Sequence, residues 1–142
     1  LMLLIPGRLA QVDEVAARHP GLQLIVDHLG LHSQHRDAQC QDDLRDLLAL
    51  AGRANVAVKA SAVPCYSTES YPFPGFKPYL KAVYEAFGPR RMLWGSDVSR
   101  LPCTYRQAVT HFTQELDFLP AADLPWVMGR ALSALLGWPE PD

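Results

Sequence analysis

The sequence has little cysteine, no long apolar run and no excess of either charge. Its cysteines, Cys40, Cys65 and Cys103, are far apart and form no CxxC motif. This spacing argues against a disulfide framework and against a zinc site built from thiolates. We therefore expect free thiols in a reducing compartment, which favours the cytoplasm. Thirteen basic and 15 acidic residues give a net charge of −2, so electrostatics favours neither a nucleic-acid partner nor an anionic membrane surface.

No apolar segment approaches the roughly 20 residues that a membrane-spanning helix needs, so we expect no membrane partner. The opening LMLLIPG also lacks the basic flank and small-residue cleavage site of a signal peptide. Because the chain begins inside this apolar run, we expect it to be a piece of a longer chain. Its 142 residues suffice for one ordinary domain. We expect a single partial domain over residues 1–142.

Short apolar runs alternate with amphipathic segments along the chain. This alternation predicts strands at 1–5, 22–27, 56–61 and 91–96, and helices at 8–19, 42–52, 76–88, 105–119 and 123–137. Such β-α units imply an α/β fold with a parallel sheet and helical crossovers. Two architectures are compatible with them: a small doubly wound sheet, or half of an eight-stranded (β/α) barrel. A flavodoxin-like nucleotide-binding domain is disfavoured, because no glycine-rich phosphate loop follows the first strand.

Polar residues stand at the ends of three expected strands. The second ends in Asp27-His28, the third carries Lys59 and Ser61, and the fourth ends in Ser96-Asp97. Ligands of both architectures bind beyond the carboxyl ends of the strands, so these groups are expected to face one cavity. His28 and Asp97 together can hold a divalent ion that activates water. Without metal, the carboxylate can take a proton from water while the imidazole stabilises the developing oxyanion.

Each of these residues also has a purely structural interpretation. Asp97 is compatible with a turn or a helix cap, and His28 with a histidine that satisfies a carbonyl group. Lys59 is expected on the opposite strand face from Val58, where it would pair with a carboxylate or reach solvent. The helical position of His111 predicts a surface residue.

Three stretches resemble a known family: RHPGLQLIVDHLG, NVAVKAS and YLKAVYEAFGPRRMLWGSDVSR. They are similar to the closing half of the amidohydrolase-2 group of metal-dependent hydrolases, whose fold is a TIM barrel. The resemblance extends over residues 1–137, and the order and spacing of DHLG and FGPRRMLWGSD are its most specific part. It implies that the chain is the C-terminal half of such a barrel, strands five to eight.

The resemblance also implies roles for individual residues. Asp97 matches the strand-eight aspartate, which binds the metal or takes the proton from the attacking water. His28 matches the strand-six histidine, which polarises the substrate or helps to hold the metal. Gly95 and Ser96 match the turn that lets the aspartate point inward. The end of the first strand, LMLLIPG, lacks the histidine that many members carry there.

Lys59 belongs to the strand-seven pattern of the family, and we expect it to contact the substrate together with Tyr66 and His32. Lactone-hydrolysing members resemble the chain best, which implies a hydrolase of a small cyclic ester or of a related C–O or C–N bond. The expected cofactor is a divalent metal held by His28 and Asp97, zinc first, with a metal-independent reaction as the alternative.

Two other functions remain open at this point. One is a metal-dependent decarboxylase of small unsaturated or aromatic acids, and the other is a truncated, inactive half-barrel. The expected partners are a small-molecule substrate and either a second copy of the chain or a missing N-terminal half. A half-barrel has two open edges, so we expect the chain by itself to be poorly stable.

Overall fold

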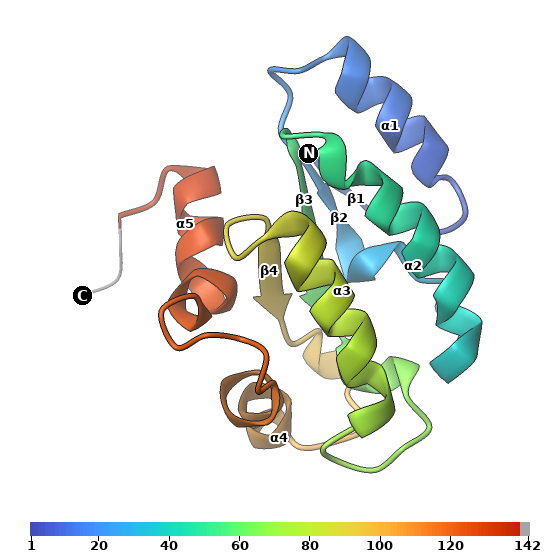
Figure 1. The fold of residues 1–142 in the computed structure, drawn as a ribbon, viewed down its shortest axis with the longest axis vertical. Helices are drawn as coiled ribbons and strands as arrows, with labels where there is room; N and C mark the ends of the chain where they lie inside the picture. The colour runs from blue at the N-terminus through green and yellow to red at the C-terminus, as the bar shows by residue number, and fades with distance from the viewer. Residues whose placement is uncertain (140–142) are drawn as a thin grey trace.

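The computed structural model describes residues 1–139, which form a four-stranded parallel sheet flanked by helices (Figure 1). The strands are β1 (Met2–Leu3), β2 (Leu24–Val26), β3 (Val56–Ser61) and β4 (Met92–Gly95). Their order in the sheet is β1-β2-β3-β4, the same as in the chain. A doubly wound sheet reverses its strand order at a switch point, whereas a (β/α) barrel does not. The structure is therefore half of a (β/α) barrel.

Three helices agree with the expected ones to within a few residues: α1 (Leu9–Arg18), α2 (Cys40–Leu48) and α3 (Lys77–Phe87). The two later helices are shorter than expected. After α4 (Tyr105–Thr110), the chain continues as a π-helical turn at His111–Glu115. A second π-helical turn, Trp126–Arg130, precedes α5 (Ala131–Leu136), because Gly129 departs from helical backbone angles.

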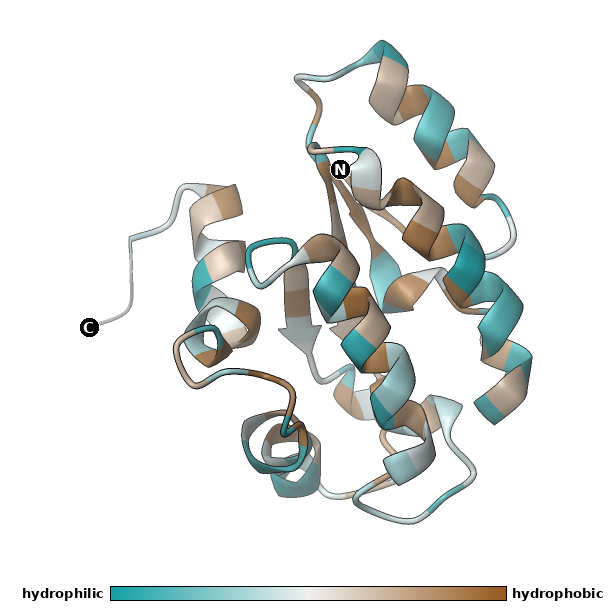
Figure 2. Ribbon diagram, in the orientation of Figure 1, coloured by the Kyte–Doolittle hydropathy of each residue, from teal (hydrophilic) through white to brown (hydrophobic). Residues whose placement is uncertain are grey.

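The two faces of the sheet are covered by different elements. Leu24, Val26 and Val58 belong to the large core that also contains the buried residues of α1, α2 and α3. Ile25, Ala57 and Leu93 point to the other face, which would be the interior of a complete barrel, and pack against Ala131 of α5. In Figure 2 the strands are brown along much of their length, as expected for a sheet buried on both faces.

Residues of the barrel-interior face alternate along each strand, since successive side chains point to opposite faces. Ala57, Lys59 and Ser61 of β3 share this face, as do Leu93 and Gly95 of β4. The first members of each series are buried under α5. The later members lie at the carboxyl ends of the strands, so the same face changes from apolar to polar along its length.

Arg91 anchors the opposite end of β4. Its guanidinium donates hydrogen bonds of 3.0–3.1 Å to the carbonyl oxygens of Ala51, Arg53 and Val56. Burial lowers its pKa, although three acceptors compensate the charge. Arg91 therefore connects the start of β4 to the segment that leads into β3.

The cysteines are free thiols, as expected: Cys40 and Cys65 are buried and Cys103 is partly exposed. Burial raises the pKa of Cys40 to about 11, and the nearby Asp43 carboxylate acts in the same direction, so this thiol is protonated at neutral pH. Among the helices of residues 1–139, none has the length and apolarity required to cross a membrane.

Candidate active site

The structure brings His28 and Asp97 together at the carboxyl ends of β2 and β4. His28 Nε2 lies 3.6 Å from Asp97 Oδ2, and the two side chains are 14% and 25% exposed. This distance is too long for a hydrogen bond. The two groups therefore face each other across a narrow gap and remain partly accessible to a ligand.

Ser61, at the end of β3, holds the imidazole in place. Its hydroxyl lies 2.7 Å from His28 Nδ1, and Ser61 is only 2% exposed. With Nδ1 engaged, Nε2 is the ring nitrogen that remains for chemistry. Gly95 of β4 is next to this pair, since a Cβ atom there would lie 3.1 Å from Ser61 Cβ. Strand β4 can thus approach β3 closely because it carries no side chain at this position.

The backbone of the VDHLG segment turns sharply after β2. His28 and Leu29 both have left-handed angles, with φ of 50° and 56°, which cost non-glycine residues energy unless the surroundings impose them. Leu29 is fully buried, and Gly30 has φ +68° with Leu9 against its Cα, so a Cβ there would lie 2.9 Å from Leu9 Cδ1. Burial of Leu29 and close packing at Gly30 keep His28 in this conformation.

Asp97 is held in a similar backbone conformation. Its φ and ψ are 47° and 59°, and it precedes a 3₁₀ turn at Val98–Arg100. Arg100 Nη1 lies 3.9 Å from Asp97 Oδ2 and donates a 3.3 Å hydrogen bond to the Tyr66 hydroxyl. Positive φ values thus occur at both members of the pair, which is a pattern of functional sites.

Lys59 faces the barrel interior, as the strand alternation predicts, and its Nζ lies 2.7 Å from Asp27 Oδ1. This contact is an ion pair without regular hydrogen-bond geometry. Tyr66 is 1% exposed and stacks near Phe76, so its hydroxyl serves mainly as the acceptor for Arg100. Lys59 is thus linked to the pair through Asp27, the neighbour of His28 in the chain, and Tyr66 through Arg100, which lies 3.9 Å from Asp97.

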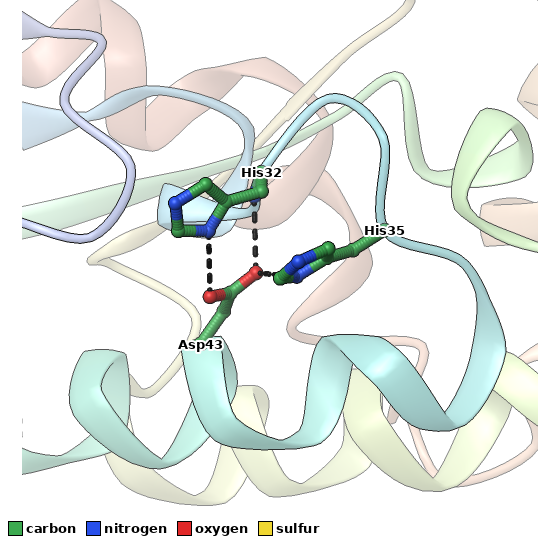
Figure 3. Close-up of side chains that lie close together, drawn as sticks. All are labelled: His32, His35 and Asp43. Carbon is green, nitrogen blue, oxygen red and sulfur yellow. Dashed lines mark hydrogen bonds and ion pairs between the residues drawn. The ribbon is translucent and has the colours of Figure 1, made fainter.

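His32, the third residue expected to bind substrate, has different neighbours. Its imidazole contacts Asp43 of α2 and lies over Gly7, where a Cβ would be 3.0 Å from His32 Nε2. His35 contacts the same carboxylate. Figure 3 shows these three side chains converging beside α2. His32 thus belongs to a second polar cluster.

Sequence reasoning missed two features of the region. Arg100 was not singled out, although its spacing from Asp97 (i, i+3) within one turn is a usable signal.

The expectation that His111 is a surface residue is wrong, because it is 1% exposed and lies against Phe73 and Phe112. Both of its ring nitrogens are buried without a hydrogen-bond partner of regular geometry. Burial lowers the pKa of His111, so the ring is neutral at pH 7.

His28 and Asp97, at the strand ends, could supply some of the ligands that a divalent metal needs. A tetrahedral zinc with N and O ligands at about 2.1 Å needs ligand atoms about 3.4 Å apart, close to the 3.6 Å between His28 Nε2 and Asp97 Oδ2. The hydrogen bond at His28 Nδ1 is the kind of support that metal-binding histidines have. Catalytic zinc usually has three protein ligands, so this pair supplies two of them.

A cavity of about 650 Å³ lies at the opposite end of the sheet, lined by Ala51, Phe87, Gly88 and Arg91 among others. Its arginine is already bonded to three carbonyl groups. Ligands of (β/α) barrels bind at the carboxyl ends of the strands. We therefore locate the candidate site at His28 and Asp97 rather than in this cavity.

The structure is thus half of a (β/α) barrel whose strand ends present a histidine and an aspartate. The sequence model of the amidohydrolase-2 family, described as amidohydrolase, matches residues 2–136. The chain belongs to this family. It is also 34% identical over 107 residues to an L-fucono-1,5-lactonase from Burkholderia ambifaria, an alignment that covers 70% of this chain and 34% of the lactonase.

Solved structures share the fold. A zinc-bound amidohydrolase from Burkholderia multivorans superposes with a TM-score of 0.80 at 24% identity, covering 97% of this chain and 52% of that one. A putative 2-pyrone-4,6-dicarboxylic acid hydrolase from Pseudomonas putida gives a TM-score of 0.67 at 24% identity, covering 94% and 50%. The chain therefore spans about half the length of these structures, and its alignment covers about a third of the curated lactonase.

Proposed function

We propose that this chain is the C-terminal half of a hydrolase that opens a small cyclic ester. The observation that carries the proposal is the 3.6 Å approach of His28 Nε2 to Asp97 Oδ2 from two different strands, with His28 held by Ser61. The 34% identity to an L-fucono-1,5-lactonase supports a lactone over other hydrolysable bonds. In this proposal residues 1–142 are one partial barrel domain.

In the proposed reaction Asp97 is the general base. Its carboxylate accepts a proton from a water molecule that attacks the ester carbonyl carbon. The Nε2 side of His28 is directed at the carbonyl oxygen, where a positioned donor stabilises the oxyanion that forms. Breakage of the ring C–O bond then returns the proton from Asp97 to the alkoxide that leaves.

His28 and Asp97 are also the residues that would hold a divalent metal, for which zinc is the best candidate. Such an ion, when bound, supplies Lewis-acid polarisation and a lower pKa for water. The bound zinc of the B. multivorans amidohydrolase supports the choice of zinc as the ion. The chain's own residues would still orient the substrate and accept the proton.

The remaining protein groups are expected from the other half of the barrel. The exposed side chains of Leu1, Met2 and Leu4, which are 51–65% exposed, border the open edge at β1. Apolar side chains at an unpaired edge favour a further strand there. We propose that an N-terminal half-barrel adds strands at this edge and at β4 and supplies the third metal ligand.

The test is the Asp97→Asn substitution in the complete protein, with hydrolysis of a sugar lactone followed by acid release. Loss of the general base should lower kcat by about 10²- to 10⁴-fold. The matched control is Asp46→Asn, which removes one charge from an exposed position on α2. Turnover at the wild-type rate in the Asp97 variant would refute the assignment. Release of carbon dioxide from an aromatic acid, instead of lactone opening, would identify the decarboxylase alternative.

A further inference from the structure

A second cluster of ligand-type side chains lies outside the proposed active site. His32 and His35 come from the loop after β2, and Asp43 comes from the first turn of α2 (Figure 3). One nitrogen of each imidazole and one carboxylate oxygen lie within 4.8 Å of one another. The proposed function uses none of these three side chains.

Asp43 is the buried centre of the cluster. It is 8% exposed, whereas the His32 and His35 side chains are 43% and 36% exposed. Its carboxylate accepts from the His32 backbone N–H at 3.0 Å and lies 2.8 Å from His32 Nδ1 and 2.7 Å from His35 Nδ1. Burial alone would raise the pKa of Asp43, but these contacts outweigh it and lower the pKa. A buried carboxylate thus has one backbone N–H and two imidazoles directed at it.

We propose that His32, His35 and Asp43 form a divalent-cation site, distinct from the one proposed at His28 and Asp97. Two imidazole nitrogens and one carboxylate oxygen are a ligand set that suits zinc and similar ions. Without an ion, Nδ1 of each imidazole lies within hydrogen-bond distance of the Asp43 carboxylate. A cation that takes these nitrogens displaces any proton they carry to Nε2 or to solvent.

The site must rearrange slightly to bind the ion. Ligand atoms around a tetrahedral zinc are about 3.4 Å apart. The imidazole–carboxylate contacts of 2.7–2.8 Å must therefore lengthen, while ligand atoms that are now up to 4.8 Å apart must approach one another. His35 is on a partly exposed loop, so its movement can provide most of this adjustment, while Asp43 and the backbone of His32 stay fixed. Water completes the coordination, since both imidazoles are partly open to solvent.

An ion here would fasten the β2–α2 loop to α2. This loop follows Val26 and carries His28. It is already attached at a second point, where Asp37 accepts hydrogen bonds from the backbone and hydroxyl of Thr68. The two attachments connect it to α2 on one side and to the β3–α3 loop on the other. The proposed role of the ion is therefore to order the segment that carries His28.

The test measures zinc bound per chain by equilibrium dialysis of the complete protein and metal analysis. The variants are His35→Gln and Asp43→Asn, with His19→Gln and Asp42→Asn as matched controls. His19 is exposed at the end of α1, and Asp42 is exposed in the same helical turn as Asp43. Both aspartate variants remove one negative charge from the first turn of α2, so each loses a favourable interaction with the helix dipole.

We expect wild type and both controls to bind one more zinc than His35→Gln and Asp43→Asn, or to bind it at least about tenfold more tightly. Zinc should also raise the melting temperature of wild type more than that of His35→Gln. His35→Gln decides the case if burial prevents Asp43→Asn from folding. Asp97→Asn should keep this zinc whether or not it retains activity, so the two proposals are separable. Equal zinc binding by wild type and His35→Gln would overturn the proposal. It would mean that the three side chains only hold the loop against α2 by hydrogen bonds.

Discussion

Removal of the buried Ser61 hydroxyl should test how much the orientation of His28 contributes to activity, because the histidine itself stays in the protein. Ser61→Ala deletes the oxygen that lies 2.7 Å from His28 Nδ1, while the Cβ that faces Gly95 stays in place. No new cavity of side-chain size forms. The change therefore acts on a single hydrogen bond in a site that is otherwise intact.

The expected magnitude follows from burial. Ser61 is 2% exposed and the His28 side chain 14% exposed, so Nδ1 loses its partner with little water to replace it. Leaving a buried polar group unpaired costs about 1–2 kcal/mol of unfolding free energy. Loss of a partner that orients a catalytic or metal-binding histidine lowers activity or metal affinity by about 10- to 100-fold.

Ser99→Ala is the matched control. Ser99 donates to Asp97, the other member of the pair, but its hydrogen bond is 3.5 Å long and the residue is exposed. Its removal should change stability by less than about 0.5 kcal/mol. Urea unfolding and lactone turnover of the complete protein measure both variants. If Ser61→Ala and Ser99→Ala proved equal in both assays, the idea that Ser61 orients His28 would be refuted.

Two further predictions concern the framework around the site. Arg91→Lys keeps the charge, but its single nitrogen cannot stand at both the Nη1 and Nη2 positions, so at least one of the three carbonyl groups loses its donor. It should cost about 2 kcal/mol of unfolding free energy. Arg90→Lys, which alters an exposed stacking contact on Trp126, should cost about 0.5 kcal/mol or less. Equal losses of unfolding free energy for the two variants, measured by urea unfolding, would contradict the role given to Arg91. The Thr68 hydroxyl lowers the pKa of Asp37, so this carboxylate stabilises the fold above its unfolded pKa of about 3.9. That contribution disappears as pH falls through the lower folded value, and Asp37→Asn, which tolerates the positive φ, should remove it. A stability difference between wild type and Asp37→Asn that does not shrink between pH 5 and pH 2 would exclude this account.

The sequence predicted the sheet well because its signals are local. Apolar runs of strand length and the helix signals around α1, α2 and α3 depend on neighbours in the chain, and the structure confirms them. The π-helical turns were not predictable in this way. They occur where the chain must pack His111 and Phe112 inward, and where Gly129 leaves the helical path, and both depend on distant contacts.

For the candidate site, the sequence predicted which residues take part but not which of them contact each other. Asp27, His28, Lys59, Ser61 and Asp97 could all be listed from the strand ends, because parallel strands deliver their carboxyl ends to one edge. The sequence did not predict which of these side chains would pair with one another. Lys59 pairs with Asp27, and Ser61 pairs with His28, because strand register and side-chain alternation set which groups meet across neighbouring strands.

The sequence by itself determined the family, the parallel β-α organisation and the residue types available at the strand ends. Only the tertiary structure decided that His28 and Asp97 stand 3.6 Å apart, that His32 turns toward Asp43, and that α5 covers the barrel-interior face. The physical reason is the separation in sequence over which each kind of interaction acts. Periodicity and turn chemistry act over a few residues, whereas these contacts join residues from 11 to more than 100 positions apart and exist only after the sheet has assembled.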